Sequence, residues 1–96
     1  MKLLFITYNE ALDNDVITLL AERGIGSWTR WIKVHGKGVA SEPHLGSHVW
    51  PKNNNALAAV GDDDTVARAF AGLRELRQRF SKEGIKAFVL PVEDVT

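Results

Sequence analysis

Residues 34–55 read VHGKGVASEPHLGSHVWPKNNN, and this stretch decides how the rest of the chain is interpreted. It holds all three histidines, two of the three prolines and the triplet Gly36-Lys37-Gly38. Its prolines and glycines argue against a helix. Connections longer than about 12–15 residues are usually functional or disordered. The stretch therefore predicts a long loop between ordinary secondary-structure elements, and it is the first place to look for function.

Length and composition limit the classes of protein to consider. The chain has 96 residues, which predicts a single domain over residues 1–96. Its 12 basic residues balance its 12 acidic residues, so the basic face expected of a nucleic-acid-binding protein is missing. It has no cysteine, which excludes disulfides and thiolate metal sites and fits a reducing cytoplasm. No apolar run approaches the length of about 20 residues that a membrane helix needs, so we expect a soluble cytoplasmic protein without membrane insertion.

The part before the loop predicts a strand, a helix and a second strand. Residues 2–8 are apolar on both alternating faces, which is typical of a central strand covered on both sides. A helix with one apolar stripe follows, and it ends near residue 23, before Gly24. Residues 25–35 form the second strand. By strict alternation, one face of this strand would carry Trp28, Arg30, Ile32 and Val34, and the other Thr29, Trp31, Lys33 and His35.

The part after the loop predicts a strand, a helix and a last strand. Residues 56–60 form the third strand, which could instead begin near residues 49–50, although the asparagine run at 53–55 is more typical of a turn. The aspartates at 62–64 are an N-cap signal for a second helix, which runs to about residue 81. Residues 85–92 form the last strand and are again apolar on both faces.

The resulting order, βαββαβ, predicts an α+β fold of the ferredoxin-like type, with both helices on one face of an antiparallel sheet. The other face of the sheet would be apolar through the first and last strands. A patch of that size needs to be covered. Assembly of copies through this face into a dimer or trimer would cover it.

The histidines are candidate metal ligands. His44 and His48 are four residues apart, and on a helix they could reach one ion. In an extended chain they would lie about 13 Å apart, at about 3.3 Å per residue. They could then share an ion only if the loop folds back, or if His35, Glu42 or another subunit completes the site. The candidate site is therefore His35, His44 and His48 for zinc, nickel or copper, and the alternative is loop histidines bonded to backbone or water.

The glycine triplet is a candidate anion site. Two glycines let backbone amides approach an anion closely, and Lys37 adds a charge. The alternative is a strand end with a bulge or a turn. Arg30, Lys33 and Lys37 could form a basic rim near the loop base for a phosphate or carboxylate ligand. The Walker pattern of a P-loop is absent, and no serine of the loop has an evident His-Asp relay, so an enzyme is not expected.

The whole chain resembles the PII-like signal-transduction superfamily. The resemblance rests on the βαββαβ order, on the long loop between the second and third strands, and on Gly36-Lys37-Gly38 where the T-loop of that superfamily leaves its second strand. It implies a homotrimer that senses a small effector, often an adenine nucleotide, in clefts between subunits and regulates a partner protein through the loop. The cleft is formed by the base of the loop and the segment before the last strand.

That last segment departs from the superfamily pattern. Residues 80–86 read FSKEGIK, with one glycine where the classical proteins have a glycine-rich phosphate loop. Lys82 and Lys86 could supply the charge instead. The resemblance therefore implies a ligand site formed by Gly36, Lys37, Gly38, Lys82 and Lys86.

Three functions follow from these observations. The first is a non-enzymatic PII-like regulator whose effector is a nucleotide or another small anion. The second is a metal sensor or metal-tolerance protein that uses the histidines of the loop. The third is a small ferredoxin-like enzyme with a histidine as general base.

Overall fold

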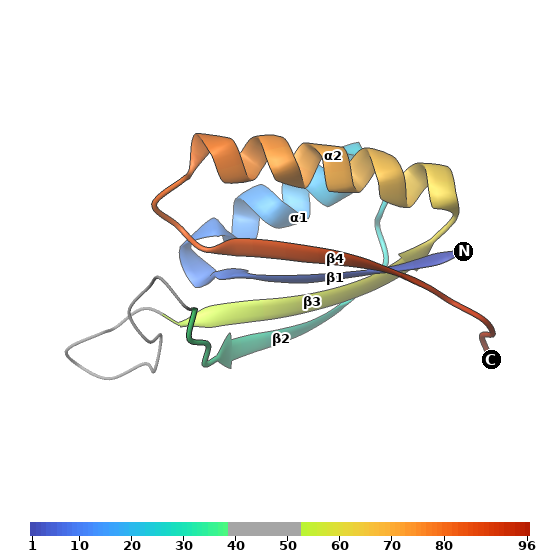
Figure 1. The fold of residues 1–96 in the computed structure, drawn as a ribbon, viewed down its shortest axis with the longest axis horizontal. Coiled ribbons are helices and arrows are strands. Elements are labelled where there is room, and N and C mark those ends of the chain that lie inside the picture. The colour runs from blue at the N-terminus through green and yellow to red at the C-terminus, as the bar shows by residue number, and fades with distance from the viewer. Residues whose placement is uncertain (39–52) are drawn as a thin grey trace.

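The structure is a computed structural model, and it describes residues 1–38 and 53–96. Two helices lie side by side on one face of a four-stranded sheet (Figure 1). The strand order is β2-β3-β1-β4, and every pair is antiparallel. The elements are β1 (Lys2–Asn9), the 3-10 helix η1 (Glu10–Leu12), α1 (Asp13–Glu22), β2 (Thr29–Val34), β3 (Asn54–Gly61), α2 (Asp63–Arg79) and β4 (Ile85–Pro91). The predicted βαββαβ order and α+β class are confirmed.

The core lies between the helices and the sheet. In β1, Leu4, Ile6 and Tyr8 point toward the helices and are buried, while the residues between them are partly exposed. Apolar side chains from α1, α2 and β3 complete this single cluster. The N-cap prediction for the second helix is also confirmed, because the Asp62 side chain accepts a hydrogen bond of 2.8 Å from the Thr65 amide.

Two predicted strand boundaries were wrong. The second strand begins at Thr29, and residues 25–28 lead into it without strand structure. The third strand begins at Asn54, so Asn54 and Asn55 belong to the strand and not to a turn. Asn55 is only 4% exposed, and its side-chain amide is hydrogen-bonded at both ends. These tertiary contacts override the turn preference of asparagine.

The alternation predicted for the second strand holds only up to Trp31. A bulge between Trp31 and Val34 shifts the register, so that Trp31 lies opposite Ala56 and Val34 lies opposite Asn54. Directly opposite residues share a face, and so do residues two apart in a strand. Val34 is therefore on the same face as Trp31, not on the face of Arg30. Within the bulge Lys33 has φ 59°, which is the left-handed region.

The face of the sheet away from the helices carries an apolar patch, which we call the open face. The described part of the chain places no helix over it. Trp31, Val60, Phe88 and Leu90 are each exposed by 45–48%. The pairing of Leu3 with Val60 and Leu90, and of Phe5 with Phe88, joins the three strands β3, β1 and β4 into one surface. The open face consists of Leu3, Phe5, Trp31, Ala56, Ala58, Val60, Phe88 and Leu90.

Candidate functional site

The base of the loop, the end of β1 and the start of β4 meet at one end of the sheet (Figure 1). Two backbone hydrogen bonds hold them together. The Asn9 amide donates to the Gly84 carbonyl, and the Glu10 amide donates to the Asn53 carbonyl, each over 2.9 Å. The segments before β3 and β4 are therefore fixed to the same turn after β1.

A hollow of about 660 Å³ opens at this end of the sheet. Its lining comes from the ends of four strands and the last turns of α2. The lining residues are Thr7, Tyr8, Val34, His35, Gly36, Lys37, Gly38, Asn54, Arg77, Gly84, Ile85 and Lys86. Gly36, Lys37, Gly38 and Lys86, four of the five predicted ligand residues, thus border one space. Lys82 is exposed in the turn before β4 and does not line the hollow.

Gly36 lies close to β3 where the loop leaves the sheet. A Cβ atom at this position would lie 2.8 Å from Nδ2 of Asn54, so the end of that side chain would have to move to admit it. The missing side chain lets the loop base pack directly against β3. Both glycines line the hollow, and a glycine has no side chain to keep an anion from its backbone amide.

The charge around the hollow has one sign. Lys37, Arg77 and Lys86 are exposed cations on its border, and none of the described lining residues is a carboxylate. Such a surface favours an anionic ligand, because no fixed negative charge competes with it. Arg77 was not among the ligand residues predicted from the sequence. Its place in the last turns of α2, beside the segment before β4, is the signal that could have identified it.

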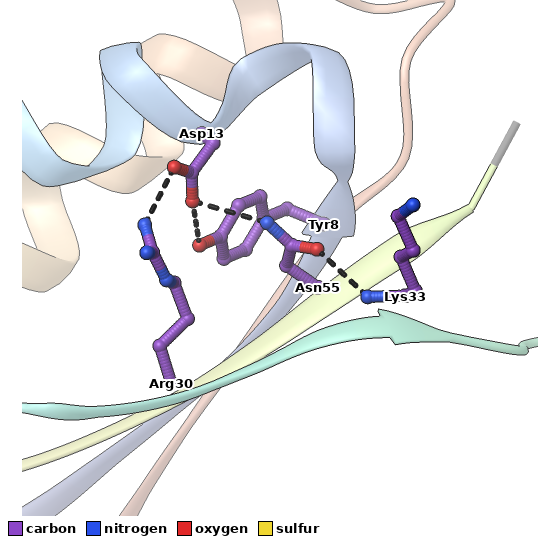
Figure 2. A network of polar contacts seen from close by, with 5 residues as sticks. All are labelled: Tyr8, Asp13, Arg30, Lys33 and Asn55. Carbon is purple, nitrogen blue, oxygen red and sulfur yellow. Dashed lines mark hydrogen bonds and ion pairs between the residues drawn. The ribbon is translucent and has the colours of Figure 1, made fainter.

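A separate polar network lies between α1 and the sheet (Figure 2). Its centre is the Asp13 carboxylate. Oδ1 accepts hydrogen bonds from Oη of Tyr8 at 2.7 Å and from Nδ2 of Asn55 at 3.1 Å, and Oδ2 accepts one from Nη1 of Arg30 at 2.7 Å. Oδ1 of Asn55 accepts a bond of 3.2 Å from the Lys33 amide. Burial, reinforced by the hydrogen bond to Asp13, raises the pKa of Tyr8 well above the usual range of tyrosine.

This network corrects the predicted basic rim. Arg30 faces the helices and forms an ion pair with Asp13, so it is not available at the loop base. No local pattern indicates this pairing, because Arg30 and Asp13 are 17 positions apart. Of the three cations proposed for the rim, Lys37 alone borders the hollow.

Of the three histidines predicted to bind a metal ion, only one lies among the described residues. His35 borders the hollow, whereas His44 and His48 lie outside the described residues. Within residues 1–38 and 53–96, no group of three histidine, aspartate or glutamate side chains could hold an ion. The three-histidine site therefore stays a prediction.

Solved structures resemble this chain over nearly its whole length. A PII-like signalling protein from Thermus thermophilus has a TM-score of 0.70 and 21% identity, covering 95% of this chain and 85% of that one. CPII from Thiomonas intermedia, a nitrogen regulatory PII-like protein bound to ADP, AMP and bicarbonate, has a TM-score of 0.71 and 20% identity, covering 97% and 88%. The chain has the fold of the PII-like signalling proteins. The same CPII bound to ADP and bicarbonate matches with a TM-score of 0.68 and 19% identity, covering 97% and 88%.

The PII-like resemblance deduced from the sequence is thus confirmed at the level of the fold. Sequence comparison alone does not reach it, because no protein-family model and no curated protein matches the chain. Within the described residues, neither helix is long and apolar enough to span a bilayer.

Proposed function

We propose that this protein is a non-enzymatic PII-like regulator that binds the phosphates of an adenine nucleotide in the hollow at the loop base. The observation that carries the proposal is that Lys37, Arg77 and Lys86 line the hollow together with Gly36 and Gly38, with no carboxylate among the described lining residues. Charged donors and accessible backbone amides are the groups that recognise phosphate. The hollow also has the size of a small-molecule site, which is typically about 300–1,000 Å³.

The CPII structures of the same fold support the choice of ligand, because they hold ADP, AMP and bicarbonate. An adenine nucleotide combines a polyanion with an apolar base. Arg77 and Lys86 suit the phosphates, while Ile85 and Val34 offer apolar surface beside them. The same cations would attract bicarbonate, so the two ligands can be tested together.

We further propose that a second copy of the chain completes the site, in a trimer assembled through the open face. Thr7 pairs with Lys86, and Val34 pairs with Asn54, and all four side chains are on the open-face side of the sheet. These four residues also line the hollow. A subunit packed on the open face would therefore form a wall of the hollow and exclude water from it.

The regulatory part of the proposal concerns residues 34–55. The hollow is bordered by the first residues of this stretch, from Val34 to Gly38. A ligand held there contacts the segment that leads into residues 39–52, which lie outside the described residues. We propose that the ligand alters how this stretch engages a partner protein.

The charge of the hollow can be tested with matched variants. Arg77→Ala and Lys86→Ala are expected to weaken ADP binding about five- to tenfold each, because an exposed charged contact to phosphate contributes about 1 kcal/mol. Arg68→Ala and Lys2→Ala make the same charge changes at the other end of α2 and β1, and should leave affinity within about twofold. Isothermal titration calorimetry with ADP and with AMP, each with and without bicarbonate, measures the difference.

Two results would count against the proposal. The first is a wild-type protein that binds neither ADP nor AMP. The second is equal loss of affinity in Arg77→Ala and Arg68→Ala, because net charge and not the hollow would then govern binding. Titration with zinc, nickel and copper in the same experiment tests the alternative that His35 and the loop histidines hold a metal ion.

A further inference from the structure

We propose that Asn55 and Asp13 are positioning residues. From the helix side of the sheet, they hold the loop base in its ligand-binding conformation. Neither residue lines the hollow. The effect on ligand affinity rests on the proposed function, whereas the effect on loop-base conformation does not. The proposal follows from the way the polar network is connected.

The first step is the orientation of the Asn55 side chain. A carboxylate can only accept hydrogen bonds, so the Asn55 group that faces Asp13 must be the NH₂. The carbonyl oxygen of the same amide is then directed at the Lys33 amide in β2 (Figure 2). Tyr8 and Arg30 hold the carboxylate itself in place. Because the Asn55 residue is 4% exposed, water cannot readily replace either partner.

The second step is the conformation of Lys33. A lysine at φ 59° is strained, because its Cβ crowds the backbone in the left-handed region. Strain of this kind persists only where surrounding contacts impose it. The bond from the Lys33 amide to Asn55 is such a contact. It places an acceptor where the bulge of β2 leaves the regular ladder.

The third step links the bulge to the hollow. The register shift brings Val34 opposite Asn54 and onto the lining side of the sheet. Gly36 then packs against the Asn54 side chain. Asn54 and Asn55 thus act from opposite faces of β3, one against the loop base after the bulge and the other on the bulge itself. Without the bond from Asn55, Lys33 is free to return to ordinary strand geometry and carry residues 34–38 with it.

The conformational part is tested without a ligand, by amide hydrogen exchange followed by NMR. Because Lys33 lies in the bulge and pairs with no residue of β3, its amide should be protected in the wild type only if the Asn55 side chain binds it. In Asn55→Leu, exchange at Lys33 should be at least about tenfold faster, and the Gly36 and Gly38 resonances should shift. Val66→Ala, a core change beside Gly61 at the far end of β3, is the matched control and should do neither.

The outcomes separate the two proposals. If Asn55→Leu does not fold, the wild-type measurement still decides, because an unprotected Lys33 amide overturns the positioning role. If both variants fold, Asn55→Leu should bind ADP about tenfold more weakly, equivalent to about 1.4 kcal/mol, while Val66→Ala binds within about twofold. Equal affinities in the two variants would overturn the role of Asn55 in binding. A wild type with the expected exchange pattern but no ADP binding would overturn the proposed function alone.

Discussion

Two substitutions of Lys33 test whether the backbone at the loop base is strained, because strain decides which of the two variants is more stable. We expect Lys33→Gly to stabilise the protein relative to Lys33→Ala. Both variants remove the same charge, and Lys33 forms no ion pair with another residue that the structure describes. They differ only in the backbone freedom of the new residue. The comparison therefore isolates the cost of φ 59° at this position.

The magnitude follows from two opposing terms. The left-handed conformation costs a residue with a Cβ about 1–2 kcal/mol, and glycine avoids this cost. Glycine loses more chain entropy on folding, by about 0.5–1 kcal/mol relative to alanine. Taking the middle of each range, the free energy of unfolding of Lys33→Gly should exceed that of Lys33→Ala by about 0.75 kcal/mol. For a domain of this size, 1 kcal/mol corresponds to about 4–8 °C in melting temperature, so the expected difference is about 3–6 °C.

The assay is thermal unfolding followed by circular dichroism. Both variants must be measured at the same protein concentration, since assembly shifts the melting temperature by mass action. If Lys33→Gly melts at the same temperature as Lys33→Ala or below it, Lys33 is not held in the left-handed region. The polar network would then not impose the bulge on β2.

Two further predictions concern the network and the open face. Tyr8 is the only tyrosine of the chain, so its phenolate absorbance can be followed directly. Its pKa is raised in the folded state, so stability from this group is complete below the unfolded pKa of about 10 and declines as pH rises through the higher folded pKa. No phenolate signal should develop when the folded protein is taken from about pH 9 to about pH 11. The signal should appear when the protein is unfolded in urea at the higher pH. A phenolate titration midpoint near pH 10 in the folded protein would contradict the buried hydrogen bond of Tyr8. Phe88→Asp places a charge in the open face and should reduce the mass measured by light scattering to that of the single chain. Val95→Asp, at an exposed tail position, should not reduce the mass. Equal masses for the two variants would exclude assembly through this face.

The order of elements was predictable because each helix and strand carries its own local signal. The apolar run in β1 and the apolar stripes of the helices are local signals of buried elements. Gly24, at φ 94°, and the cap residue Asp62 mark helix ends through chemistry that depends only on near neighbours. These signals survive in a single sequence, so the ferredoxin-like fold could be deduced without a relative.

The errors have the opposite origin, since they depend on contacts between distant residues. Asn55 is a turn former in isolation, but Asp13, which is 42 positions away, makes it a buried strand residue. The bulge in β2 follows from the Asn55 contact, so strict alternation assigned Val34 to the wrong face. Arg30 was assigned to the loop base because nothing near it in the sequence indicates its partner, the Asp13 carboxylate at the start of α1. A partner separated by tens of residues leaves no pattern in the sequence around either member.

Part of the lining of the hollow lies on the same side of the sheet as the open face, and this has a thermodynamic consequence. Thr7 and Lys86 border the hollow and pair on the open-face side of the sheet. A subunit seated on that face would change the surroundings of a bound phosphate, and a bound phosphate would neutralise cations that otherwise repel each other near the interface. Coupling between two binding equilibria is reciprocal, so a ligand that prefers the assembled form must favour assembly by the same factor. If the hollow binds phosphate as proposed, its exposed cations would bind weakly in the single chain, and assembly would be the step that gives the hollow its affinity.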